Sequence, residues 1–231
     1  ILITQPFQTA WVPYSVSMAG EPDCKRAYAE VMKQFTTLIV GFALVMSLAA
    51  RDLIHLMAAP AYWSAYMVVP LICFSQVMRG LAYMLEVGMV ISKRTAYRIP
   101  AVVSATVVNL GLDFLLVPRL GAVGAAWASV VSFSLFAAIT YMLSRKLYPI
   151  RYEWASIVIT FLLGAGLFAV GEVIQPVSMA MAISVKVGLF VAFPACLLAS
   201  GIWPRDQVAK IKGMLLTGWR PTRSLAHGGE G

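Results

Sequence analysis

Long apolar runs separated by short charged linkers are the feature that most constrains this chain. Seven such runs can be marked in the 231 residues, and most are near the length of about 20 residues that a helix needs to cross a bilayer. Their approximate bounds are 1–19, 35–50, 65–92, 96–117, 122–143, 154–173 and 179–203. Only 12% of the residues are charged, against about 25% in a typical soluble domain. The sequence therefore predicts an all-α integral membrane protein, an antiparallel bundle of about six full transmembrane helices and one truncated helix.

The number of Lys and Arg residues alternates from one linker to the next. The linkers after successive runs hold 3, 1, 3, 1, 3, 0 and 5 of them, and cytoplasmic loops carry the excess of such residues. The linkers after the first, third and fifth runs, and the C-terminus, are therefore predicted to be cytoplasmic. This orientation accounts for the formal net charge of +8, so no nucleic-acid partner is predicted.

Two amphipathic stretches are predicted to lie on the membrane surface rather than cross it. Residues 23–34 mix apolar and charged side chains, and residues 205–219 place Ile211 and Leu215 at helical spacing among lysines. Such helices are held by burial of their apolar face and by anionic lipid. Residues 205–231 are predicted to form a basic amphipathic cytoplasmic tail that is partly disordered.

The most specific motif combines a helix carrying two spaced polar residues with a proline, two spaced glycines and a run of small residues. Its positions in this sequence are Asn109, Asp113, Pro118, Gly121 and Gly124. Over about 13–147 the chain resembles the polysaccharide biosynthesis flippases of the multidrug/oligosaccharidyl-lipid/polysaccharide superfamily. Asp113 departs from the family pattern, in which Asn is commoner at that position.

The resemblance implies an arrangement of helices. Family members have two lobes of six helices, often followed by two more, and the chain begins inside an apolar run at Ile1. Residues 1–147 are then expected to hold the eighth to twelfth helices, the first of them truncated. Residues 148–204 are expected to hold two additional transmembrane helices, and the N-terminal lobe is expected to be missing from this chain.

The resemblance also implies a function. The protein is expected to be a flippase that moves an undecaprenyl-(pyro)phosphate-linked oligosaccharide across the bacterial inner membrane, for cell-surface polysaccharide such as the O-antigen of lipopolysaccharide. Its expected partners are this lipid-linked substrate, the bilayer and the missing lobe. The sequence holds no nucleotide-binding loop of the form GxxxxGK[ST], so a proton or sodium ion is the expected coupling partner.

Five polar residues inside the apolar runs are candidates for lining a substrate cavity: Arg79, Gln76, Glu86, Asn109 and Asp113. A charge at the bilayer centre costs about 2.5–3.5 kcal/mol on insertion scales, so such groups should face a cavity or a partner. Arg79 either meets the phosphates of the substrate or forms a buried pair with Asp113, Glu86 or the missing lobe. Glu86 either serves ion coupling or is simply paired or directed to the interface, and Asn109 is expected to make an interhelical hydrogen bond.

The proline and glycines of the motif are expected to serve packing rather than chemistry. Pro118 is predicted to end its helix at the outer interface. Gly121 and Gly124 are predicted to permit a tight turn and a close contact between helices, as small residues do in membranes.

Two alternative functions stay open. A membrane enzyme such as a sugar polymerase or acyltransferase would need acid–base or nucleophilic groups gathered at one face. The apolar runs hold neither a histidine nor a cluster of acids, so no enzyme activity, catalytic residue, cofactor or metal site is predicted. An ion-coupled small-molecule exporter of the same superfamily usually stops after twelve helices, whereas the last two runs imply fourteen.

Overall fold

The computed structural model describes residues 4–174 and 179–199, and every regular element in these ranges is a helix. The chain divides after Phe193 into two units. The described part of the second unit, residues 194–199, is the last part of one helix. In chain order the elements are α1 (Thr4–Ser17), α2 (Cys24–Met57), the 3₁₀ helix η1 (Pro60–Val68), α3 (Val69–Leu85), α4 (Val87–Ile91), the 3₁₀ turn η2 (Thr95–Tyr97), α5 (Arg98–Leu120), α6 (Ala122–Leu147), α7 (Trp154–Val173) and α8 (Met179–Ala199).

Five segments of the described chain are long and apolar enough to cross a membrane. They are Cys24–Met57, Pro60–Ile91, Thr95–Leu120, Ala122–Leu147 and Trp154–Val173. The first predicted run corresponds to the 14-residue α1 and the last to α8, of which Ser184–Ala199 is apolar but shorter than a membrane span. The protein is therefore an all-helical, multi-pass membrane protein. The predicted surface helix at 205–219 and the predicted tail lie outside the described residues.

The helix α2 is longer than the sequence pattern indicates, and the prediction of a separate surface helix at 23–34 is wrong. These residues form the first turns of one continuous helix of 34 residues, about 51 Å long at 1.5 Å per residue. Tyr28 is buried, and its hydroxyl donates to the Ser15 carbonyl oxygen at 2.6 Å. Lys33 is bonded to Glu153 in the linker before α7. The apolar face of residues 23–34 therefore packs against other parts of the protein, with Tyr28 and Met32 buried.

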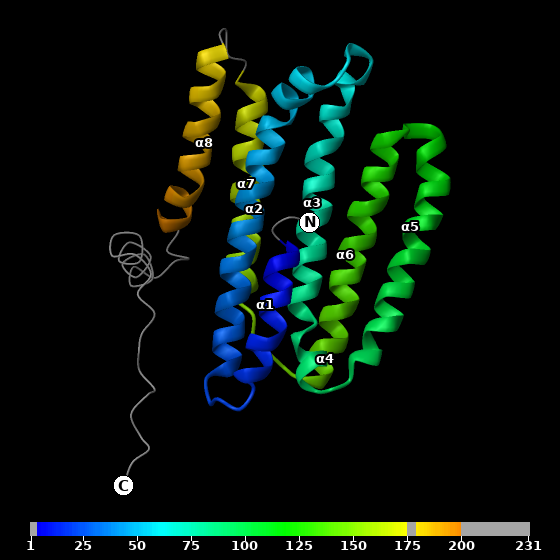
Figure 1. The fold of residues 1–231 in the computed structure, drawn as a ribbon, viewed down its shortest axis with the longest axis vertical. Coiled ribbons are helices and arrows are strands. Elements are labelled where there is room, and N and C mark those ends of the chain that lie inside the picture. The colour runs from blue at the N-terminus through cyan, green and yellow to red at the C-terminus, as the bar shows by residue number, and fades with distance from the viewer. Residues whose placement is uncertain (1–3, 175–178, 200–231) are drawn as a thin grey trace. The chain divides into compact units, whose positions relative to one another are not determined.

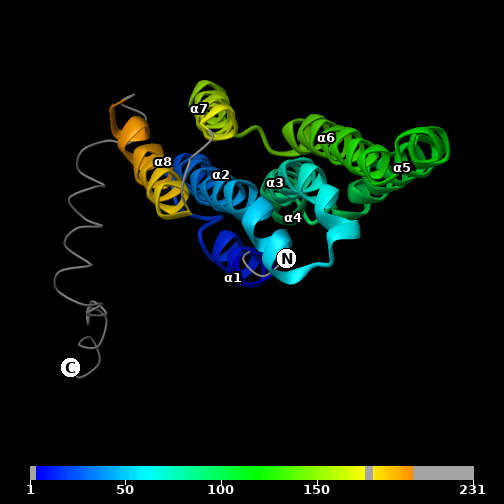
Figure 2. The ribbon, with the colours of Figure 1, turned by 90° about the horizontal axis from the view of Figure 1, so that it is seen from above.

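The helices pack in an order that differs from their order along the chain. The main contacts join α2 with α7, α2 with α3, α3 with α6, and α6 with α5. Figure 1 shows the result: α6 returns to lie between α3 and α5, and α5 stands at the edge of the described unit. The view from above in Figure 2 shows the same edge position for α5. Both α3 and α5 therefore flank one helix, α6.

Small residues make this three-helix contact close. Ala82 of α3 and both Ala101 and Ala105 of α5 are buried around Phe136 of α6. Helices in lipid associate through close packing rather than through hydrophobic burial, which favours small side chains at their contacts. Phe136 of α6 therefore contacts a cluster that includes residues of both α3 and α5.

The turn between α5 and α6 corrects one prediction about the motif. Pro118 does not end α5; it lies within the last turn, and the helix continues to Leu120. The chain reverses at Gly121, which has a φ of +59° and a ψ of −136°. Only glycine adopts this combination readily, because it has no Cβ. The tight turn predicted for the glycines thus lies at Gly121.

The linkers rich in Lys and Arg gather at one end of the described unit. The α1–α2, α4–α5 and α6–α7 connections lie together there, and η1 and the α5–α6 turn lie at the opposite end (Figure 1). Lys25, in the first turn of α2, stands 4.8 Å from the centre of the Tyr148 ring in the α6–α7 linker, so the start of α2 contacts that linker at this end. This end is hereafter the basic end, and the positive-inside rule predicts that it faces the cytoplasm.

Cysteine labelling in intact cells tests this orientation. With the three native cysteines replaced, a cysteine at Arg94 or Lys146 should resist a membrane-impermeant maleimide added outside. A cysteine at Arg119, next to the α5–α6 turn, should react, because all three positions are exposed and Arg119 lies at the opposite end from the other two. Labelling with the opposite pattern would overturn the predicted orientation.

Candidate functional site

A cavity of about 340 Å³ lies between α3, α5 and α6. Its lining combines two guanidinium groups with an amide, hydroxyls and aromatic rings. The residues are Arg79, Tyr83, Arg98, Val102, Ala105, Thr106, Asn109, Leu110, Ser132, Phe133 and Phe136. Along α5 the lining extends from Arg98 to Leu110, about 18 Å at 1.5 Å per residue. The cavity is therefore elongated along the helix axis, with one end at the basic end of the unit.

Arg79 is one of the two cations of this lining. Its guanidinium lies 5.6 Å from the centre of the Phe133 ring, across the cavity on α6. The ion pairs of the described residues do not include Arg79. A cation over an aromatic face is attracted by the ring quadrupole, by about 0.5–2 kcal/mol depending on desolvation. Such a contact holds the guanidinium in place without neutralising it, so Arg79 keeps a positive charge available to a ligand.

Arg98 is the second cation of the lining, and it has a carboxylate partner. Its Nε lies 3.0 Å from Oε1 of Glu86, and its guanidinium lies 5.5 Å from the centre of the Tyr83 ring. The Glu86 side chain is 14% exposed, whereas that of Arg98 is 46% exposed. The distance is that of an ion pair, but Oε1 accepts no hydrogen bond of good geometry within the described chain. The pair is therefore electrostatic and poorly aligned.

Two of the five predicted residues, Arg79 and Asn109, line the cavity, and the other three do not. Glu86 adjoins the lining through Arg98. Oxygen atoms of Gln76 and Asp113 are buried without a hydrogen-bond partner among the described residues. Neither alternative partner from the described chain, Asp113 or Glu86, pairs with Arg79, because Glu86 is turned to Arg98 instead.

Sequence reasoning missed Arg98 as a site residue, because it was counted among the linker cations that set orientation. A signal for it was present. Arg98, Ala105 and Asn109 follow each other at spacings of seven and four, which places them on one face of a helix. A face that carries a cation, a small residue and an amide in this order is suited to line a polar cavity.

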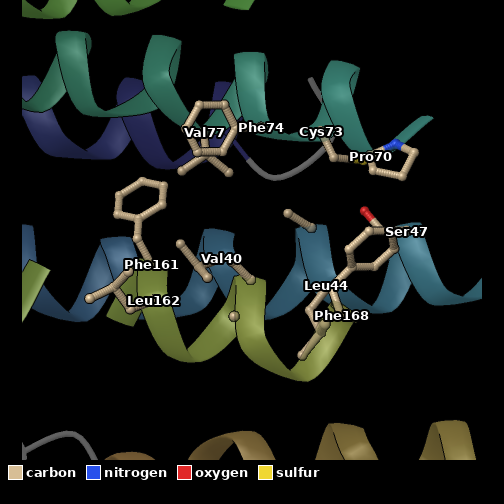
Figure 3. Close-up of a pocket in the computed structure, with 13 residues that line it drawn as sticks. Val40, Leu44, Ser47, Pro70, Cys73, Phe74, Val77, Phe161, Leu162 and Phe168 are labelled. Carbon is tan, nitrogen blue, oxygen red and sulfur yellow. The ribbon is translucent and has the colours of Figure 1, made fainter. Parts of the chain in front are cut away.

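A second cavity, of about 320 Å³, lies between α2, α3 and α7 and is almost entirely apolar. Figure 3 shows Phe74 and Val77 of α3 facing Val40 of α2 and Phe161 of α7 across it. Ser47 and Cys73 are the polar side chains of its lining. The contrast between the two cavities is chemical: one presents cations and hydrogen-bond donors, and the other presents hydrocarbon.

Polar contacts at the basic end tie the linker before α7 to α2. Lys33, whose side chain is 10% exposed, donates to Oε2 of Glu153 at 3.0 Å. This hydrogen bond lowers the pKa of Glu153 below its usual value. Tyr148 lies 3.3 Å from the Cys24 thiol, and this hydrogen bond, with burial, raises the pKa of Tyr148 to about 12. Both contacts keep the linker closed against α2.

Gly124 of the motif lies where α5 and α6 approach each other closely. A Cβ atom at this position would stand 2.5 Å from the carbonyl oxygen of Leu116 and 2.7 Å from its carbonyl carbon. Such distances are far inside van der Waals contact, and the obstructing atoms are backbone. The glycines of the motif thus allow α5 and α6 to form a tight helical hairpin. Side chains of α5 in this hairpin line one side of the polar cavity.

The described residues contain no group of three or more His, Cys, Asp or Glu side chains placed to hold a metal ion. The polar cavity presents two guanidinium groups, and a guanidinium forms paired hydrogen bonds with carboxylate and phosphate oxygens. Compared with models of protein families, with curated proteins and with solved structures, the chain matches none.

Proposed function

We propose that the protein is a flippase for a lipid-linked oligosaccharide whose lipid carries an anionic phosphate or diphosphate. The observation that carries this proposal is the Arg79 guanidinium, which lies in a cavity within membrane-spanning helices and has no carboxylate partner among the described residues. Arg79 is half-buried, and a cation without a counter-ion inside membrane-spanning helices is costly and marks a ligand or ion pathway. Phosphate oxygens accept paired hydrogen bonds from a guanidinium.

The rest of the lining supports a substrate with polar and anionic parts. The Asn109 amide, in the same cavity as Arg79, offers hydrogen bonds to sugar hydroxyls. The apolar cavity between α2, α3 and α7 offers a surface for a hydrocarbon chain. An exporter of cationic drugs is less well supported, because two arginines in the lining would repel a cation. The resemblance to the polysaccharide flippases points to an undecaprenyl carrier in the bacterial inner membrane.

Complementation tests this function. The full-length protein should restore surface polysaccharide to a bacterial strain that lacks its own flippase. Purified protein in proteoliposomes should increase the fraction of a lipid-linked oligosaccharide that an added enzyme can reach. If neither assay responds while the protein is folded, and the cells instead gain resistance to cationic drugs, the exporter is the better description.

A further inference from the structure

The two guanidinium groups of the polar cavity differ in how their charge is compensated. Arg79 contacts the Phe133 ring and forms no ion pair within the described chain, whereas Arg98 is paired with Glu86. Glu86 itself does not line the cavity. The lining thus presents Arg79, which has no counter-ion among the described residues, and Arg98, which is paired with a carboxylate outside the lining.

Glu86 reaches Arg98 from an interruption in its own helix. The α3 helix ends at Leu85 and α4 begins at Val87, and Glu86 stands between them. Arg98 is the first residue of α5. Asn109 lies eleven residues further along α5, about 16 Å deeper at 1.5 Å per residue. The pair therefore stands at the basic end of the cavity, and the Asn109 amide lies well inside.

The Glu86–Arg98 pair is of a kind that a stronger anion can displace. Nε and Oε1 are 3.0 Å apart without a well-formed hydrogen bond, and Arg98 is 46% exposed. A diphosphate offers several oxygens in the fork geometry that a guanidinium matches, so it gains hydrogen bonds that Glu86 does not make.

We propose that Glu86 is an exchangeable counter-ion of Arg98, and that a lipid diphosphate entering from the basic end displaces it and binds both Arg98 and Arg79. This inference rests on the proposed function; it narrows the headgroup to a diphosphate and adds a residue that determines specificity for it. While the cavity is empty, Glu86 compensates one of the two cations. A bound diphosphate places its two phosphate groups against the two guanidinium groups and displaces Glu86. A neutral lipid does not displace Glu86, so Arg98 stays paired with it.

Binding of farnesyl diphosphate to the purified full-length protein tests this exchange, with farnesol as the uncharged control and calorimetry as the measurement. Glu86→Gln removes the competing charge and keeps the side-chain shape, so it should tighten binding by roughly three- to tenfold. Glu86→Asp shortens the reach to Arg98 and should tighten binding in the same direction if Glu86→Gln does not fold. Glu21→Gln, an exposed acid in the α1–α2 loop, is the matched control and should leave binding unchanged.

A double-mutant cycle shows whether Glu86 acts through Arg98. Arg98→Gln should weaken binding by about tenfold, and adding Glu86→Gln to Arg98→Gln should then produce no tightening, because the cation that Glu86 masks is gone. Tightening that persists in the Arg98→Gln background would mean a general charge effect and overturn the exchange. So would unchanged or weaker binding by both Glu86 variants.

The proposed function and this inference fail in different ways. If wild-type protein binds farnesyl diphosphate no better than farnesol, the anionic-lipid site itself is wrong, and the exchange falls with it. If wild-type binds the diphosphate and Arg79→Ala weakens that binding while the Glu86 variants change nothing, the site stands and only the exchange is refuted.

Discussion

Replacing Gly124 with leucine is expected to abolish most of the folded protein in the membrane. Even the first carbon of a new side chain would meet the Leu116 backbone at 2.5 Å, and a backbone atom cannot rotate away as a side chain can. Overpacking of a close contact typically costs about 1–3 kcal/mol and occasionally more. Gly124→Ala should therefore already lower thermal stability clearly, and Gly124→Leu should prevent the α5–α6 hairpin from closing.

Gly111 supplies the matched control for this prediction. It lies in α5 of the same hairpin, but a Cβ atom there would meet nothing within 4 Å. Gly111→Ala should leave stability within about 1 kcal/mol of wild type, because only helix propensity changes. Both variants are compared by thermal unfolding and size-exclusion chromatography in detergent. Equal stability of Gly124→Ala and Gly111→Ala would show that the α5–α6 contact is not tight in the native protein.

Loss of Arg79 is the second change with a large expected effect, and it acts on transport rather than folding. Arg79→Ala removes the cation that is free to meet the substrate, and a charge-assisted hydrogen bond of about 1.5–3 kcal/mol corresponds to a loss of roughly ten- to a hundredfold in transport. The variant should still accumulate, because Arg79 forms no ion pair within the described chain and its removal therefore takes no partner from a carboxylate. Arg79→Lys should keep part of the activity, since it retains the charge without the fork.

Complementation with protein level measured in the same cells separates the two roles of Arg79. Arg119→Ala, at an exposed position near the α5–α6 turn, is the matched control and should transport normally. A second change at Asp113 should not rescue Arg79→Ala, because the two residues are not paired. Poor accumulation of Arg79→Ala, restored by neutralising Asp113, would instead indicate a buried structural pair. A stable and fully active Arg79→Ala variant would contradict the cavity role.

The sequence alone indicated most helices, and some of them closely. The run predicted at 154–173 has the bounds of α7, and the run at 122–143 lies within α6. This agreement has a local cause, since partition of a segment into hydrocarbon depends on its own apolar length. The 23–34 stretch was misassigned because its charges suggested a surface, whereas Lys33 is compensated by Glu153, which is distant in the chain.

The sequence likewise identified some residues of the candidate site and missed others. Arg79 and Asn109 were found from the sequence, because a polar group inside an apolar run stands out wherever it packs. The ionic partner of Glu86 was not predicted from the sequence. Helical spacing places Glu86 on the same face as Arg79, seven residues earlier, and so suggested Arg79 as a partner. Its actual partner, Arg98, belongs to another helix.

The sequence by itself thus determined that this chain is an all-helical membrane protein, which segments are apolar enough to cross, and which buried polar residues need a partner or a ligand. Only the tertiary structure decided that α6 returns between α3 and α5, that Arg79 and Arg98 line one cavity, and that Glu86 compensates Arg98 alone. The physical reason is range: transfer into a bilayer is a property of each segment, whereas the choice of an ionic partner depends on which helices become neighbours.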